Sequence, residues 1–116
     1  MSRLPVVLSS LLLLATPALA APADEAAIRA AIVGNTVQGE MAVSGRYTEF
    51  YAANGEIHGK DYTGKWTAQG DQMCFQYGEE PPSCWQVEID GQNVTWLKDG
   101  RPDGTGTIVQ GNPDNY

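Results

Sequence analysis

The chain has two cysteines, Cys74 and Cys84, whose thiols could take part in redox chemistry, metal binding or a structural disulfide. They flank an acidic turn with two prolines. A thioredoxin-like pair needs Cys-x-x-Cys spacing beside a helix, and structural zinc sites use four ligands. Nine residues separate these cysteines, their flanks have strand character, and the chain has one histidine, His58. The pattern therefore favours a disulfide between Cys74 and Cys84.

The other side chains that could act in catalysis form no recognisable group. His58 has no obvious nucleophile beside it, and Ser44 and Ser83 lack the Gly-x-Ser-x-Gly setting of a hydrolase nucleophile. Glu49 and Glu56 flank a predicted hairpin and could face each other as an acid–base pair. We expect them instead on the solvated face of two strands. The sequence thus predicts no catalytic residue and a protein that is not an enzyme.

Two acidic turns carry oxygen atoms of the kind that calcium binds, at residues 90–93 and 99–104. Neither has the ligand spacing or the bidentate glutamate of an EF-hand, and ordinary Asp-Gly turn chemistry accounts for both. We therefore predict no metal site and no cofactor. The glycosylation sequon at residues 93–95 is attributed to chance, because the alanine-rich leader has a bacterial character.

The aromatic side chains are the remaining candidates for a site. Small barrels can hold one apolar ligand, and we take as ligand-binding candidates Tyr47, Tyr51, Trp66, Trp85 and Trp96. A domain of about 100 residues also needs large side chains in its core. Core filling is the favoured role of Trp66 and Trp85, together with Phe75. Tyr47 and Tyr51 share a strand face with Glu49, either in an exposed patch or at a barrel mouth.

Residues 1–20 have the anatomy of a secretory signal peptide. Arg3 supplies the positive start, residues 4–14 form a short apolar run, and Ala18 and Ala20 precede the predicted cleavage site. The apolar run is shorter than the roughly 20 residues of a membrane-spanning helix. We therefore expect a single mature domain of residues 21–116 in the periplasm or secreted, with no membrane insertion after cleavage. That compartment is oxidising, which agrees with a disulfide.

The charge balance of the predicted mature chain is acidic. Six Lys and Arg stand against 14 Asp and Glu, which gives a formal charge of −8. Nucleic acids and anionic membrane surfaces select basic faces, so the composition argues against both as partners.

The elements that must position these residues are one helix and a series of short strands. Residues 24–33 have helical composition, with Ile28 and Ile32 on one face and Gly34 as the stop. The rest alternates between apolar and polar positions, with turn residues between the runs. We expect strands at residues 36–43, 46–52, 56–58, 64–68, 72–77, 84–89, 93–97 and 105–109, a loop at 98–103, and a loose tail from Gly111. Such spacing predicts an all-β, up-and-down barrel of seven or eight antiparallel strands, with the helix over one mouth or on one face.

Four segments resemble a group of small exported proteobacterial proteins of unknown function, whose domains are lipocalin-like β-barrels. The segments are GNTVQG (34–39), TEFYAANGEIHG (48–59), GKWTAQGDQMCFQY (64–77) and SCWQVEIDGQNVTW (83–96). The resemblance implies a lipocalin-like barrel and transfers no catalytic residue. The part from Trp66 through Gly70-Asp71 to Cys74 is also similar to secreted inhibitors of bacterial metalloproteases, which are small barrels with one disulfide.

Together these features predict a non-enzymatic, exported binding protein. Its expected partner is a small apolar ligand or another protein of the cell envelope. The alternative function is inhibition of a protease in the periplasm or outside the cell.

Overall fold

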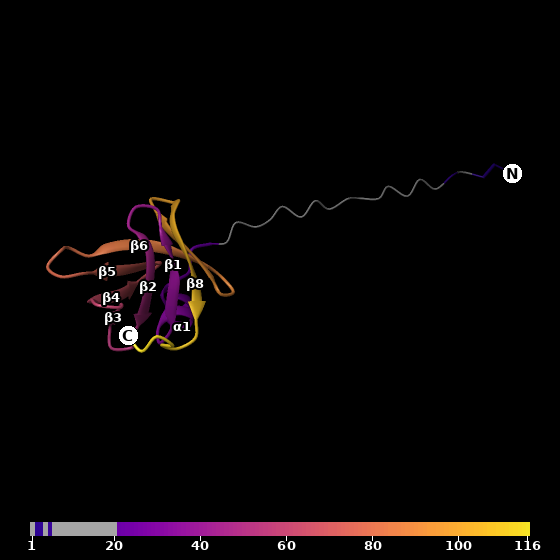
Figure 1. Cartoon of the computed structure of the whole chain (residues 1–116). Coiled ribbons are helices and arrows are strands. Elements are labelled where there is room, and N and C mark those ends of the chain that lie inside the picture. The colour runs from indigo at the N-terminus through magenta and orange to yellow at the C-terminus, as the bar shows by residue number, and fades with distance from the viewer. Residues whose placement is uncertain (1, 4, 6–20) are drawn as a thin grey trace.

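The computed structural model describes residues 2, 3, 5 and 21–116 (Figure 1). The signal peptide predicted for residues 1–20 therefore lies almost wholly outside the described residues. No helix in the described part of the chain is long and apolar enough to cross a membrane.

The single predicted helix is present as α1, Glu25–Ile32. Asp24 precedes it as the N-cap, and its carboxylate accepts a hydrogen bond of 2.8 Å from the backbone N–H of Ala27. Ile28 and Ile32, four residues apart, are both completely buried. The short helix is thus held by its apolar face, which packs into the barrel core.

Eight antiparallel strands follow and close into a barrel in which each strand pairs with its neighbours in sequence (Figure 1). The ring is completed by β1 pairing with β8. This arrangement confirms the predicted all-β, up-and-down barrel with one short helix. The strands are β1 (Thr36–Met41), β2 (Gly45–Tyr51), β3 (Glu56–His58), β4 (Thr63–Gln69), β5 (Gln72–Gln76), β6 (Ser83–Asp90), β7 (Asn93–Lys98) and β8 (Arg101–Val109).

The last strand begins earlier than the sequence suggests. A loop was expected over residues 98–103, but β8 starts at Arg101 and Lys98 already pairs with it. Asp99 and Gly100 both adopt positive φ, 52° and 76°, as a two-residue hairpin turn requires. The turn therefore reverses the chain within two residues, and Pro102 is accommodated beside a register shift after Trp96.

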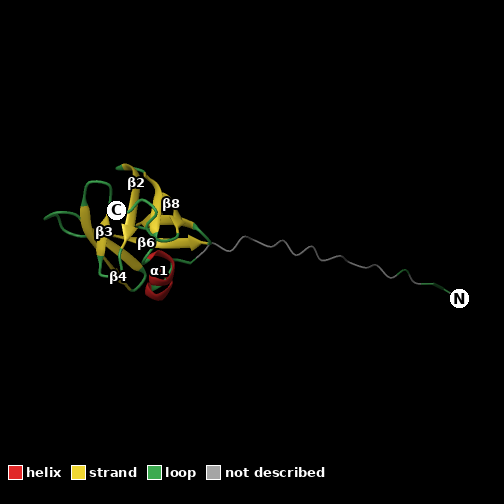
Figure 2. Cartoon of the chain, turned by 60° about the horizontal axis from the view of Figure 1, so that its bottom comes forward, coloured by secondary structure: helices red, strands yellow, loops and turns green. Residues whose placement is uncertain are grey.

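The two ends of the barrel differ. At one, called here the helix end, α1 packs against β4 and β5 (Figure 2 shows α1 beside β4), and the Arg29 guanidinium lies 3.5 Å from the Ala68 carbonyl oxygen. At the opposite end, called the pocket end, lie the turns that join β1 to β2, β3 to β4, β5 to β6 and β7 to β8. Apolar side chains fill the helix end, among them Ile28, Ile32, Val37, Ile57, Ala68 and Val87.

The disulfide between Cys74 and Cys84 is present, which confirms the favoured role of the two cysteines. They are direct cross-strand partners in the β5–β6 register, with Cα atoms 4.0 Å apart. Their neighbours Met73 and Phe75 point inward and are buried, so the bond lies on the outer face of the barrel.

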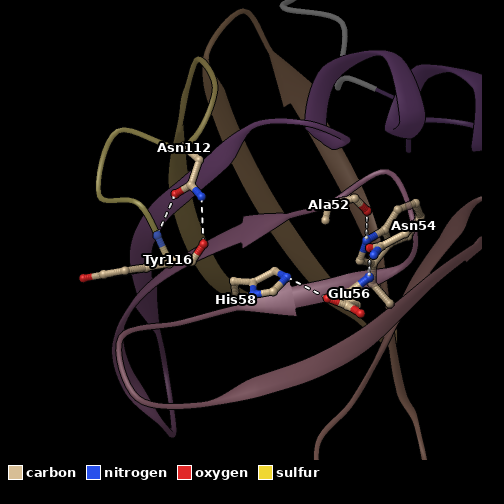
Figure 3. Close-up of polar contacts among 7 residues, drawn as sticks. Ala52, Asn54, Glu56, His58, Asn112 and Tyr116 are labelled. Carbon is tan, nitrogen blue, oxygen red and sulfur yellow. Dashed lines mark hydrogen bonds and ion pairs between the residues drawn. The ribbon is translucent and has the colours of Figure 1, made fainter.

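The C-terminal tail is not the loose end that the sequence suggested. The Gly111 carbonyl accepts a 2.7 Å hydrogen bond from the Thr36 hydroxyl, and its N–H donates to the Asn35 side chain at 3.0 Å. Further on, the Asn112 side chain bonds both the N–H and the carbonyl of Tyr116 (Figure 3). Asparagine side chains commonly close such local turns, which is why a polar tail can be ordered.

Candidate functional site

Glu49 is the central polar residue inside the barrel. It lies on β2, where residues alternate between the two faces, and it shares the inward face with Tyr47 and Tyr51. Only 5% of Glu49 is exposed. The expectation that Glu49 and Glu56 form one solvated face is therefore wrong. The Glu56 side chain is 52% exposed and pairs with His58 outside the barrel.

Three tyrosine hydroxyls donate hydrogen bonds to the Glu49 carboxylate. The Tyr51 hydroxyl lies 2.9 Å from Oε1, and the Tyr62 hydroxyl lies 2.8 Å from Oε2. The Tyr77 hydroxyl lies between the two oxygens, at 2.9 Å and 2.8 Å. The buried carboxylate is thus satisfied by neutral donors, the arrangement that a buried polar group requires.

Two of these tyrosines come from loops at the pocket end. Tyr62 closes the β3–β4 connection, and Tyr77 directly follows β5. A Cβ atom at Gly59 would overlap the Tyr62 ring, and one at Gly64 would lie 2.8 Å from Tyr77 Cδ1. Glycine at both positions therefore lets the rings cross the backbone closely and reach Glu49.

A second set of hydrogen bonds joins Tyr47 on β2 to β7 and β8. The Trp96 indole N–H donates to the Tyr47 hydroxyl at 2.8 Å, and that hydroxyl donates to the Thr105 carbonyl oxygen at 2.9 Å. The Phe75 ring packs edge-on against Trp85 and Trp96, with centroids 5.6 and 5.3 Å apart. These contacts fix the aromatic rings in one arrangement.

These side chains line a pocket of about 330 Å³. That volume is at the lower end of the range found for small-molecule sites. The lining residues are Met41, Ser44, Arg46, Tyr47, Glu49, Tyr51, Tyr62, Phe75, Tyr77, Trp85 and Trp96. The walls are therefore mainly aromatic, and Glu49 is the buried charged group among them.

Of the five predicted ligand-binding residues, the structure brings four to this pocket: Tyr47, Tyr51, Trp85 and Trp96. Trp66 does not reach it. Its indole N–H donates to the Ala52 carbonyl at 2.9 Å, and the Arg29 guanidinium lies 5.6 Å from its ring centroid. Trp66 thus belongs to the core at the helix end, because α1 covers that part of β4.

The five predicted ligand-binding residues do not include Glu49, Tyr62, Phe75 or Tyr77, which also line the pocket. The alternation on β2 did place Glu49 on the face of Tyr47 and Tyr51, but it did not show which face is inside. Tyr62 and Tyr77 are separated from Glu49 by 13 and 28 residues, respectively. No local pattern marks these contacts.

His58 lies apart from the pocket. Its Nε2 atom is 2.9 Å from Glu56 Oε2 at the outer edge of β3 (Figure 3), and its ring centroid is 6.2 Å from that of Phe50. Within the described residues, no group of three or more His, Cys, Asp or Glu side chains is placed to hold a metal ion.

The tyrosines around Glu49 keep their protons well into alkaline solution. Burial raises the pKa of Tyr47 to about 12, against the ordinary value of 10.0. Burial first, and then the negative charge of Glu49, raise the pKa values of Tyr51, Tyr62 and Tyr77 as well. All four hydroxyls therefore act as hydrogen-bond donors at neutral pH rather than as ionised bases.

These pKa shifts predict a loss of stability at alkaline pH. The folded state holds the tyrosine protons more tightly than the unfolded state, so their contribution is fully present below pH 10. It should fall as the pH rises from 10 through about 12, the pKa of Tyr47. Urea unfolding midpoints at pH 8, 10 and 11 would measure the decline, and Tyr47→Phe should make it shallower. The ionisation of these tyrosines in the folded protein can be followed by the absorbance at 295 nm. If all of them ionised with a midpoint near pH 10, the expected loss of stability would be contradicted.

Comparison with known proteins adds no further assignment: no family model, curated protein or solved structure matches this chain.

Proposed function

We propose that this protein is a non-enzymatic, exported binding protein that holds a small, largely apolar ligand in the aromatic pocket of its barrel. The observation that carries the proposal is the contrast between the two barrel ends. The helix end is filled by buried side chains, whereas the pocket end keeps a space of about 330 Å³ lined mainly by aromatic residues. Concave, mostly apolar pockets with a few placed polar groups are the usual form of small-molecule sites.

The hydrogen bonds around the pocket support binding rather than catalysis. The hydroxyls of Tyr51, Tyr62 and Tyr77 are committed to Glu49, and that of Tyr47 is committed to Thr105. These hydrogen bonds hold the pocket side chains in place, so less conformational entropy is lost when a ligand binds. The disulfide on the outer face and the leader sequence support export to an oxidising compartment.

The three tryptophans make a direct test possible. Trp85 and Trp96 line the pocket, whereas Trp66 lies at the helix end. In a ¹H–¹⁵N spectrum, titration with tert-butylbenzene or 1-naphthol, two neutral aromatic probes, should shift the indole N–H signals of Trp85 and Trp96. The Trp66 signal should move least and serves as the internal control.

Equal shifts at all three tryptophans would indicate non-specific association, and no shift with either probe would contradict an apolar-ligand pocket. Binding to an envelope protein and inhibition of a protease stay predictions from the sequence. No contact among residues 21–116 favours either over the pocket.

A further inference from the structure

The Glu49 carboxylate offers a ligand negative charge, but tyrosine hydroxyls already take most of its acceptor positions. Oε1 accepts hydrogen bonds from Tyr51 and Tyr77, and Oε2 accepts from Tyr62 and Tyr77. An ionised carboxylate has about four lone-pair sites, and three hydroxyl protons are directed at them, with that of Tyr77 shared between the two oxygens. A ligand N–H group that bonds Glu49 would therefore compete with the tyrosine hydroxyls, and first with the shared Tyr77.

Among residues 21–116, no cation forms an ion pair with the Glu49 carboxylate. The two ion pairs among residues 21–116 are Arg29 with Glu25 and His58 with Glu56, and both lie outside the pocket. Arg46 touches the pocket, but it is exposed and occupies an outward position on β2, between the inward Tyr47 and the turn. The interior of the pocket thus combines one buried negative charge with aromatic faces.

We propose that the pocket selects an organic cation whose nitrogen is fully substituted: a quaternary ammonium group on a small apolar body. This inference rests on the proposed function, because it names the class of ligand for the same pocket. Aromatic faces attract such a cation through their negative π surfaces, and the attraction strengthens where water is excluded. A quaternary nitrogen has no N–H groups and needs no acceptor, so it gains from the Glu49 charge while leaving the three tyrosine hydroxyls on the carboxylate.

A primary ammonium group is the competing class. It brings three N–H donors that lose water on entering the pocket. Those donors would have to compete with three tyrosine hydroxyls for Glu49, or turn to hydroxyl oxygens, of which that of Tyr47 already accepts from Trp96. Donors left without partners cost binding free energy, so the primary amine should bind more weakly.

Three probes of nearly equal size separate these possibilities. Phenyltrimethylammonium carries the quaternary charge, tert-butylbenzene is its neutral isostere, and benzylammonium is a primary amine. Dissociation constants would be obtained from the indole N–H shifts of Trp85 and Trp96, which line the pocket. We expect phenyltrimethylammonium to bind about tenfold or more tightly than tert-butylbenzene, and more tightly than benzylammonium.

Two matched pairs of variants locate the effect. Glu49→Gln removes the pocket charge, and Glu56→Gln makes the same change of net charge on the outer surface. Glu49→Gln should lower the affinity for phenyltrimethylammonium by about tenfold and change that for tert-butylbenzene less than about twofold. Glu56→Gln should leave both affinities unchanged.

The second pair keeps the test valid if Glu49→Gln fails to fold. Tyr62 lies in a loop and is 45% exposed, so its substitution does not open the core. Tyr62→Phe keeps an aromatic face beside the pocket, whereas Tyr62→Leu removes it. The leucine variant should lose about two- to fivefold in affinity for phenyltrimethylammonium relative to the phenylalanine variant.

The outcomes distinguish this inference from the proposed function. If tert-butylbenzene binds as tightly as the quaternary cation, or benzylammonium binds as tightly or more tightly, the cation selection is wrong and the apolar pocket stands. If none of the probes moves the Trp85 and Trp96 signals, both proposals are wrong.

Discussion

Replacing Glu49 with leucine should lower the free energy of unfolding by about 2–4 kcal/mol. The substitution removes the acceptor of all three tyrosine hydroxyls while keeping a side chain of similar size. Tyr51 is 1% exposed, so its hydroxyl would be left buried without a partner. Tyr62 and Tyr77 are more than one third exposed and can return to water, which limits the loss. Relief from burying a carboxylate offsets part of it.

Urea unfolding followed by far-ultraviolet circular dichroism would measure this change, with Glu56→Gln as the control for charge.

A second variant tests the cause. Combining Glu49→Leu with Tyr51→Phe removes both the acceptor and the donor that is fully buried. Replacing both partners by apolar groups is nearly neutral in other proteins, so this double variant should regain part of the lost stability. A cost below about 1 kcal/mol for Glu49→Leu would show that the tyrosine cluster does not stabilise the barrel.

Removing the disulfide should cost about 2–3 kcal/mol, the value that the loop-entropy model gives for a bridge closing so short a loop. The cross-link joins β5 and β6, whose register comprises four residue pairs. These two strands carry Phe75 and Trp85 of the pocket, and Tyr77 begins the turn between them. Loss of the bond should therefore also weaken binding of neutral probes at the pocket end.

The Cys74→Ala, Cys84→Ala double variant and the reduced natural chain provide two routes to the same state. If the cross-link itself is the cause, both should show the same decrease in the free energy of unfolding relative to the oxidised protein. An unchanged free energy in both would contradict the stabilising role. A decrease in the double variant alone would assign the effect to side-chain packing instead of the covalent bond.

The composition and alternation of the sequence were sufficient to predict the architecture. Short apolar-polar runs separated by Gly, Asn and Asp indicated successive hairpins, and successive hairpins pair neighbouring strands. The same local logic put Cys74 and Cys84 on successive strands joined by one turn, which is compatible with a disulfide, and the structure shows them as direct cross-strand partners. The sequence pattern placed the start of the last strand too late, at residue 105. It did not separate the two turn residues, 99 and 100, from the strand residues that follow them.

The candidate site could be predicted only in part. Alternation showed that Tyr47, Glu49 and Tyr51 share a face, and the aromatic composition made Trp85 and Trp96 candidates. It could not show that the shared face of β2 is the inner one, because a carboxylate inside a small barrel is unfavourable until donors surround it. Nor could it separate Trp66 from the pocket, since that depends on which barrel end α1 covers.

By itself, then, the sequence determined what depends on near neighbours: the helix, the strands, most of the turns and the cross-strand disulfide. The tertiary structure alone decided where Glu49 lies and what surrounds it. Tyr62 and Tyr77 reach the carboxylate from two different loops, across Gly59 and Gly64, only after the barrel has closed. The physical reason is that closure fixes the register of all eight strands at once, and this register sets which distant side chains meet inside.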